Sequence, residues 1–503
     1  MVWLAALGFL VAAAVALGSG HAIAAAGCAG ADADYNGDGV RDTAIADPEA
    51  TVGTKADAGA ITVVYGGDAG TVQLHQDLAS VPGDAASGAE FGYSMAQADL
   101  NGDGCGDLVA AAPYADIAGV RDAGAVYVIY GSPGGLGSGS AGVTYIQGER
   151  SVPGAPEAGD VFGYSVAAGK AASGPYLAIG IPGEDLNVPA ASGSGTVAMR
   201  DAGGIVYIRG SAVGWVDQNS ADVAGGVEAD DRFGASLTGD AAHLAVGGPG
   251  EAIGANGFAG SVWLFGHTVD SEGHPKPLSG ANQDSPDASA DDVADAGDRF
   301  ATSIALTPMP DKTGVYAGGS YLAVGSPGED VGAAADAGSL TLYKVTAAGA
   351  MTVVTGALNQ DPVSVGETAD PGDFFGQELA ATVQGTTLRL AVGVPGEESS
   401  DEHIDKGGVQ IFAIAANGTS TDQWLDPGWG IPGEPAHQMF VGTSLAATPE
   451  ALLIGVAYEP GTAPGTVYGF DWAVQSGGAP TKTYKPGDGG IPTGGTAFGA
   501  EIR

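Results

Sequence analysis

A short pattern that repeats seven times is the feature of this sequence that most constrains its fold. A Phe-Gly-like pair recurs at intervals of 71, 71, 67, 75, 65 and 58 residues. The pairs are Phe91-Gly92, Phe162-Gly163, Phe233-Gly234, Phe300-Ala301, Phe375-Gly376, Phe440-Val441 and Phe498-Gly499. Periods of this length indicate an array of similar units, each packed against its neighbours. One array accommodates all 503 residues, a length that otherwise suggests two or more domains.

Two further elements follow each of the first six pairs in constant order. The first is a short apolar run that ends in small residues and usually Pro, such as Leu108 to Pro113. The second opens with Gly and alternates in polarity, such as Gly124 to Tyr130, and a weaker fourth run completes the unit. Short alternating runs rich in β-branched and aromatic residues predict strands. The sequence therefore predicts an all-β fold, a seven-bladed β-propeller of four-stranded antiparallel blades.

The two ends of the array are complementary. The first unit lacks a Phe-Gly strand and begins with the apolar element Thr43 to Pro48, whereas the chain ends with a spare strand, Phe498 to Arg503. An open ring would leave two sheet edges exposed. We therefore expect the C-terminal strand to pair into blade one and close the ring, with a frayed tail as the alternative.

The order Phe-Gly-x-Ser, then small residues with Pro, then Gly-x-Val-Tyr resembles the FG-GAP repeat of integrin α-subunits and of many secreted bacterial proteins. The resemblance runs from about residue 29 to residue 503, with departures at Ala301, Val441 and Ala457. It implies an extracellular propeller that serves as a binding or adhesion module for a protein or glycan ligand. A secreted hydrolase or lyase that uses the propeller as a scaffold is the alternative.

Two segments read Asp-x-Asn-Gly-Asp-Gly-x-x-Asp, and both precede an apolar strand. Calcium takes six to eight oxygen ligands, which alternate residues of a tight loop can supply. The expected side-chain ligands are Asp34, Asn36, Asp38 and Asp42 in the first loop and Asp99, Asn101, Asp103 and Asp107 in the second; Val40 and Cys105 would give backbone carbonyls. The cofactor expected is calcium, and the alternative is a pair of acidic hairpins without metal.

The charge and the N-terminus indicate where the chain works. A formal net charge of -42 disfavours nucleic acid as a partner and attracts cations. Residues 1–26 resemble a signal peptide, which leaves residues 27–503 as the propeller, with no membrane span after signal removal. We expect a secreted or cell-surface monomer. An uncleaved membrane anchor is the alternative for the apolar start.

Cysteine and aromatic residues give further candidate sites. Cys28 and Cys105 are the only cysteines, and in an exported chain they predict a disulfide; a lipidated Cys28 is the alternative. Trp429 and Tyr458 are candidate ligand contacts in loops of blades six and seven, although packing between blades explains them as well. Both loops should lie on the face opposite the calcium loops, where loops vary most in length.

No catalytic residues are expected from this sequence. The glutamates of the recurring Pro-Gly-Glu segments, for example Pro182-Gly183-Glu184, are interpreted as one turn position repeated from blade to blade. The Gly-x-Ser-x-Gly and His-Glu-x-x-His patterns of hydrolases do not occur in the chain.

Overall fold

The computed structural model describes residues 28, 30, 32–190, 194–285, 293–310, 316–362, 365–398, 403–415, 420–461 and 464–503. The expected signal peptide, residues 1–26, lies outside these residues. All regular elements in the described part of the chain are β-strands.

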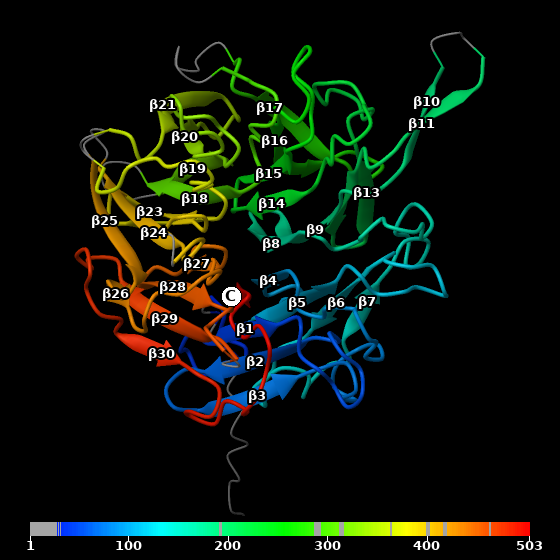
Figure 1. The fold of residues 1–503 in the computed structure, drawn as a ribbon. Helices are drawn as coiled ribbons and strands as arrows, with labels where there is room; N and C mark the ends of the chain where they lie inside the picture. Colours follow the sequence, from blue (N-terminus) through cyan, green and yellow to red (C-terminus); the bar gives the residue numbers. More distant parts are fainter. Residues whose placement is uncertain are drawn as a thin grey trace, which may run out of the picture.

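Seven antiparallel sheets surround a central axis, as predicted from the repeats (Figure 1). Blade one contains β1 (Thr43–Asp47), β2 (Ala60–Tyr65), β3 (Gly70–Leu74) and β31 (Glu501–Ile502), and blade two contains β4 (Met95–Ala98), β5 (Asp107–Ala112), β6 (Ala125–Ile129) and β7 (Val143–Tyr145). Blade three contains β8 (Val166–Ala171), β9 (Gly174–Ile181), β12 (Gly204–Arg209) and β13 (Ala212–Val216), and blade four contains β14 (Ser236–Gly239), β15 (His243–Gly248), β16 (Ser261–Val269) and β17 (Pro275–Ala281).

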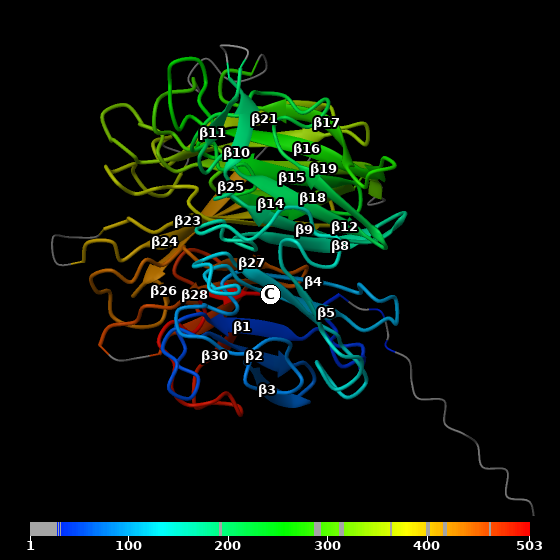
Figure 2. The same ribbon diagram turned by 90° about the vertical axis from the view of Figure 1, so that its right-hand side faces the viewer.

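The remaining three blades follow the same plan, and blades one and five lie on opposite sides of the ring (Figures 1 and 2). Blade five contains β18 (Ile304–Pro310), β19 (Tyr316–Ser326), β20 (Ser339–Val345) and β21 (Met351–Leu358). Blade six contains β22 (Leu379–Gln384), β23 (Thr387–Val394), β24 (Gly408–Ile414), β25 (Ser420–Pro427) and the short parallel β26 (Gly430–Ile431). Blade seven contains β27 (Leu445–Ala447), β28 (Ala451–Val456), β29 (Thr466–Asp471) and β30 (Lys482–Tyr484).

The ring closes through the C-terminal strand, as expected. β31 pairs with β1, with Ile45 opposite Ile502 and Ala46 opposite Glu501. Two further backbone bonds join Ala44 and Arg503, one in each direction, the second 2.8 Å long from Arg503 N to Ala44 O. Blade one is therefore built from both ends of the described chain.

The recurring Phe and Gly residues join each blade to the one before it. Phe91 N donates to Ala58 O of blade one at 3.1 Å, and the equivalent bond recurs at the other six blade boundaries. Gly59, which directly precedes β2, has φ +85°, and a Cβ there would lie 2.2 Å from Phe91 O. Glycine at this position allows the two backbones to approach. The Phe side chain fills the core between sheets, and Phe91 is fully buried.

The Ser of Phe-Gly-x-Ser adds a second bond between neighbouring blades. Ser94 Oγ donates to Gly163 O of the next blade at 2.7 Å, and Ser303 Oγ donates to Gly376 O at 2.6 Å. Blades six and one carry Glu378 and Glu501 in the equivalent position.

The structure corrects the alignment of the repeat in blade seven. Phe440-Val441 was read as its Phe-Gly pair, but Val441 makes the backbone contact to Gly407 that Phe233 makes to Gly203 and Phe300 to Gly260. Gly442 has φ +104° and takes the place of the repeat glycine. Blade seven therefore keeps the repeat glycine as Gly442 and has Val441 in place of the repeat Phe. Phe440 lies one position before the residue that makes the contact.

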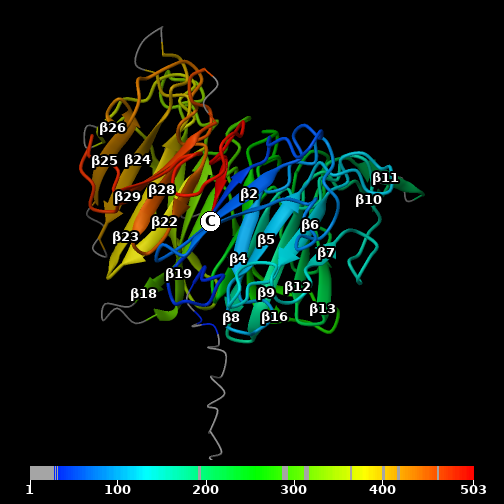
Figure 3. The same cartoon turned by 90° about the horizontal axis from the view of Figure 1, so that it is seen from below.

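The long connection of blade three forms a β-hairpin that the sequence did not predict. β10 (Leu186–Pro189) pairs with β11 (Thr196–Met199). The hairpin projects away from the ring (Figures 1 and 3). Its side chains are mostly exposed or half-buried.

Candidate functional site

The first Asp-Asn-Asp loop, residues 34–42, gathers its polar side chains in one tight turn ahead of β1. The Asp34 carboxylate accepts from Asp38 N at 3.0 Å and from Gly39 N at 2.8 Å. Asn36 Oδ1 also accepts from Asp38 N, and Asp38 Oδ1 accepts from Val40 N at 2.8 Å. Three of the expected side-chain ligands therefore lie along the same short stretch of backbone.

The second loop, residues 99–107, repeats this arrangement between β4 and β5. The Asp99 carboxylate accepts from Gly102 N at 2.7 Å and from Gly104 N at 3.2 Å. Asn101 Oδ1 accepts from Asp103 N, and Asp103 Oδ1 accepts from Cys105 N at 2.9 Å. The bonds accepted by the Asn and by the second Asp are the same in both loops, whereas Asp99 accepts from Gly102 N where Asp34 accepts from Asp38 N.

The last carboxylate of each loop ties the loop to its own blade. Asp42 accepts from Tyr35 N at 2.7 Å and from Gly66 N at 2.8 Å. Asp107 accepts from Leu100 N at 2.8 Å and from Gly131 N at 2.9 Å. Burial raises the pKa of both carboxyls to about 6, although these N–H groups oppose the shift.

A disulfide joins the segment that precedes the first loop to the second loop, as predicted. Cys28 is bonded to Cys105 across a Cα–Cα distance of 4.8 Å. The Asp103 carboxylate lies within 4.8 Å of both sulfur atoms. Gly30 N donates to Gly104 O at 2.9 Å and Gly106 N donates to Asp34 O at 2.8 Å, so backbone bonds reinforce the link. The two loops form one acidic surface, which we call the Asp-Asn-Asp face.

Strand order places the Pro-Gly-Glu loops on the opposite face of the ring. The second Asp-Asn-Asp loop joins β4 to β5, whereas Pro-Gly-Glu loops join the second strand of a blade to the third. Successive strands are antiparallel, so these two kinds of loop emerge at opposite ends of the blade. We call the second side the Pro-Gly-Glu face. Its glycine is required sterically, because a Cβ on Gly183 would lie 1.9 Å from Gly159 O.

Trp429 and Tyr458 both emerge from loops of the Pro-Gly-Glu face, and both are exposed, at 58% and 42%. The Trp429 ring lies against Gly477, where an added Cβ would come within 2.5 Å of it. The Tyr458 hydroxyl donates to Glu49 at 3.0 Å, beside a hollow of about 400 Å³ near blade one. Trp429 does not line this hollow. The two aromatic residues therefore occupy separate parts of the face.

A recess of about 370 Å³ on the same face was not predicted from the sequence. Arg232 and Arg299 line it, together with Tyr164 and the partly exposed Phe258. The Arg232 guanidinium lies 5.8 Å from the centre of the Phe258 ring. The chain holds only 17 Lys and Arg residues, and two of them meet at this recess, where Asp201 also lines the wall and Arg299 pairs with Asp336 at 3.0 Å. The sequence signal for this recess is an Arg directly before the repeat Phe, at Arg232 and again at Arg299.

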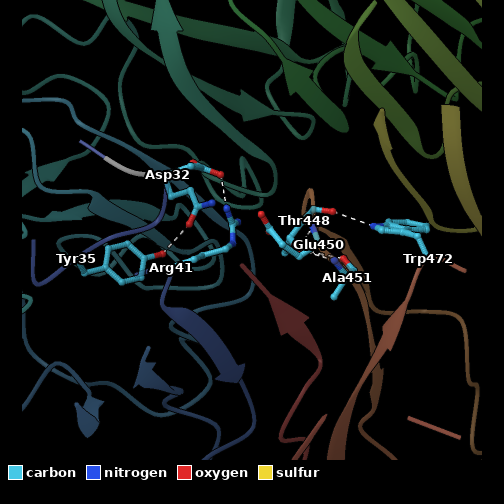
Figure 4. A network of polar contacts seen from close by, with 8 residues as sticks. Asp32, Tyr35, Arg41, Thr448, Glu450, Ala451 and Trp472 are labelled. Carbon is cyan, nitrogen blue, oxygen red and sulfur yellow. Dashed lines mark hydrogen bonds and ion pairs between the residues drawn. The ribbon is translucent and has the colours of Figure 1, made fainter. Parts of the chain in front are cut away.

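The innermost strands line a central channel of about 540 Å³. Asp32 and Arg41 form an ion pair at one side of it and Thr448 lies at the other, where the Thr448 carbonyl accepts from Trp472 Nε1 at 2.9 Å (Figure 4). Burial raises the pKa of Glu378, inside this channel, to about 8, and the nearby Glu501 carboxylate adds to the shift. The channel is therefore polar, and Arg41 and Arg503 line it together with acidic residues.

Comparison with known proteins agrees with the sequence pattern. The FG-GAP repeat family model matches residues 91–129, which include the second Asp-Asn-Asp loop and β4 to β6. Integrin alpha-PS5 of Drosophila melanogaster is 36% identical over 104 residues, a match that covers 20% of this chain and 9% of that relative. The chain thus matches about a tenth of the relative's length. The resemblance to FG-GAP repeats and integrin α-subunits is confirmed.

A solved structure gives a more distant likeness. The periplasmic gluconolactonase of Pseudomonas aeruginosa superposes with a TM-score of 0.45 at 9% identity, over 92% of this chain and 98% of that chain. Within the residues that the structure describes, no helix has the length and apolar character needed to cross a membrane.

Proposed function

From a closed ring of seven FG-GAP-type blades, we propose that this protein is an exported, calcium-binding, integrin-like module that binds a protein or glycan ligand. Calcium would bind to the Asp-Asn-Asp face, and the ligand to the Pro-Gly-Glu face. The observation that carries the proposal is the pair of Asp-Asn-Asp loops, which share most of their internal hydrogen bonds and are held together by a backbone bond from Gly106 N to Asp34 O.

The chemistry of the two loops supports calcium. Every expected ligand is a carboxylate, amide or backbone carbonyl oxygen, and calcium prefers such hard oxygen ligands in flexible geometry. In each loop the acidic and amide side chains are already held by backbone N–H groups, which limits the entropy lost on binding. A divalent cation would also reduce the repulsion between the carboxylates.

The disulfide supports an extracellular location, because such bonds persist in oxidising compartments. The apolar segment at residues 1–26 would then direct export. On this proposal the mature protein functions outside the cytoplasm, as a monomer.

The Pro-Gly-Glu face offers the groups that ligands use. Arg232 with the Phe258 ring combines a positive charge with an apolar surface, which suits an anionic group on the ligand. Tyr458 and Trp429 expose aromatic rings that can stack on sugars or on protein side chains. Rigid blades with variable loops resemble other scaffolds on which binding sites are carried by loops.

Binding to a glycan array and to a panel of extracellular proteins, in the presence of calcium, tests this function. We expect Arg232→Ala, Trp429→Ala and Tyr458→Ala to identify the ligand contacts, with at least one of them weakening binding tenfold at unchanged calcium affinity. Val40→Ala is the matched control on the other face, because it trims an exposed side chain and keeps the backbone carbonyl.

Two results would contradict the proposal. If only Asp38→Ala and Asp103→Ala abolish binding in a folded protein, then calcium itself bridges the ligand and the face is assigned wrongly. If neither the glycan array nor the protein panel shows a ligand, and a broad hydrolase and lyase screen shows turnover, the protein is an enzyme.

A further inference from the structure

A buried group of three polar side chains lies at the junction between blades three and four. Gln218, Asp231 and Glu251 come from three separate segments and are 4%, 0% and 7% exposed. Gln218 Nε2 donates to Glu251 Oε2 at 2.5 Å, and Asp231 Oδ2 accepts from Glu228 N at 2.6 Å. We call this group the blade-four cluster.

The same three residue types recur together at three other junctions. The equivalent sets are Gln147, Asp160 and Glu184 in blade three, Gln283, Asp298 and Glu329 in blade five, and Gln360, Asp373 and Glu397 in blade six. In each set the Gln amide donates to the Glu carboxylate, and the Asp accepts from a backbone N–H three residues earlier. In blade two, Gln76 remains but Ala89 and Ala115 replace both acids. Blade seven keeps Glu459 but has Met439 in place of the Asp, so the two carboxylates occur together only at the junctions of blades three to six.

The blade-four cluster contains oxygen atoms without partners. Gln218 Oε1 and Asp231 Oδ1 are both fully buried and accept no hydrogen bond. Unsatisfied polar atoms at such depth destabilise the fold unless a ligand satisfies them. Gly225, with φ +98°, packs directly against the cluster, because an added Cβ would lie 2.9 Å from Gln218 Nε2 and 3.2 Å from Glu251 Oε1.

The charges around this cluster have one sign. Burial raises the pKa of Asp231 and of Glu251 to about 7. The neighbouring Asp231 carboxylate also raises the pKa of Glu251. Glu228 raises the pKa of both groups, and Asp230 raises that of Asp231. Two carboxylates and an amide oxygen are therefore buried together, and no Lys, Arg or His is among the groups that act on the pKa of either carboxyl.

Blade six has such a partner in its own chain. Lys406 is 2% exposed, donates to Asp426 at 2.7 Å, and opposes the rise in the pKa values of Asp373 and Glu397. It stands directly before Gly407, the glycine that precedes β24. In blades three, four and five, the equivalent residue is a fully buried alanine: Ala202, Ala259 and Ala337.

We propose that the clusters of blades three, four and five each bind a calcium ion from solution. The ion would supply the positive charge that the Lys406 ammonium supplies in blade six. The Gln carbonyl oxygen and the two carboxylates would be its side-chain ligands. These sites are distinct from the Asp-Asn-Asp loops and do not depend on them.

The donor set points to calcium among common cations. All three side chains offer oxygen, and two of them carry charge, which favours a hard divalent ion. Magnesium demands a near-ideal octahedron and releases its water reluctantly, which suits an enclosed junction poorly. Each ion would hold together two neighbouring blades, since the Gln belongs to the end of one blade and the acids to the next.

Calorimetric calcium titration of the full chain tests the proposal in the background Asp38→Ala/Asp103→Ala, which removes binding by the loops. After chelation, at pH 8 and in 150 mM NaCl, this background should bind three equivalents of calcium. Ala259→Lys, added to it, should leave two equivalents, because the new ammonium takes the place of one ion. Asp231→Asn/Glu251→Gln keeps the shape of the cluster and should also leave two.

The proposal is overturned if the background binds no calcium, in which case the carboxyl pairs share a proton instead. It is also overturned if both added variants still bind three equivalents. Should Ala259→Lys fail to fold, the isosteric pair of substitutions decides the question.

Discussion

Removal of the last strand should destabilise the whole ring. Deleting residues 497–503 takes away Phe498 and Ile502, which are 3% and 1% exposed and pack in the core shared by blades seven and one. Burial of two such side chains contributes about 3–6 kcal/mol. The deletion also removes the backbone bonds between Ala44 and Arg503 and the bond from Gly499 N to Ala46 O. At about 1 kcal/mol each, these add about 3 kcal/mol.

The expected loss of roughly 6–9 kcal/mol is comparable with the total stability of a typical domain. We expect the melting temperature, measured by scanning calorimetry, to fall by about 10 °C or more. Phe498→Ala should reproduce about 3–5 kcal/mol of this loss in denaturant unfolding. Trp429→Ala, at a 58% exposed site, is the control and should have little effect. A deletion variant that melts within 2 °C of the full chain would refute closure by β31.

Further predictions concern charge, the disulfide and calcium. The pKa of Glu378 is raised from 4.5 in the unfolded chain to about 8, so the folded state holds a proton more tightly and stability should fall as pH rises between these values. Glu378→Gln should reduce the loss of unfolding free energy between pH 5 and pH 8.5, measured by denaturant unfolding. An equal loss in the variant and the wild type would contradict the assignment. Cys28→Ser/Cys105→Ser should cost up to about 4 kcal/mol, and intact mass should show no free thiol in the secreted wild type. Chelation of calcium should lower the melting temperature, and a melting curve unaffected by EDTA would count against bound calcium.

Much of the fold follows from the sequence because each repeat contains residues that are required sterically where two blades meet. Gly59 and its equivalents allow a Phe backbone to approach, so the pattern identifies both the strand and its neighbour. The alignment of blade seven was misread because Phe440 stands next to Val441, and side-chain identity alone cannot show which residue contacts Gly407. The hairpin of β10 and β11 has no counterpart in the other blades, so the repeat gave no indication of it.

The loops were easier to predict than the clusters. Asp34 to Asp42 lie within one continuous segment, so their spacing alone brings the side chains together. Gln218, Asp231 and Glu251 are brought together only when three segments meet at a blade junction. The recurrence of Gln76, Gln147, Gln218, Gln283 and Gln360 at the ends of blades was the signal available in the sequence.

The most direct test of the account is the number of calcium ions bound by the wild type and by two single variants, measured by calorimetry on chelated protein. Asp38 and Asp103 occupy equivalent positions in the two loops, and each accepts a backbone bond within its own loop. The account predicts that Asp38→Ala and Asp103→Ala each remove one equivalent relative to the wild type, and that the double variant removes two. A wild type that binds no calcium, or variants that bind as many ions as the wild type, would contradict it.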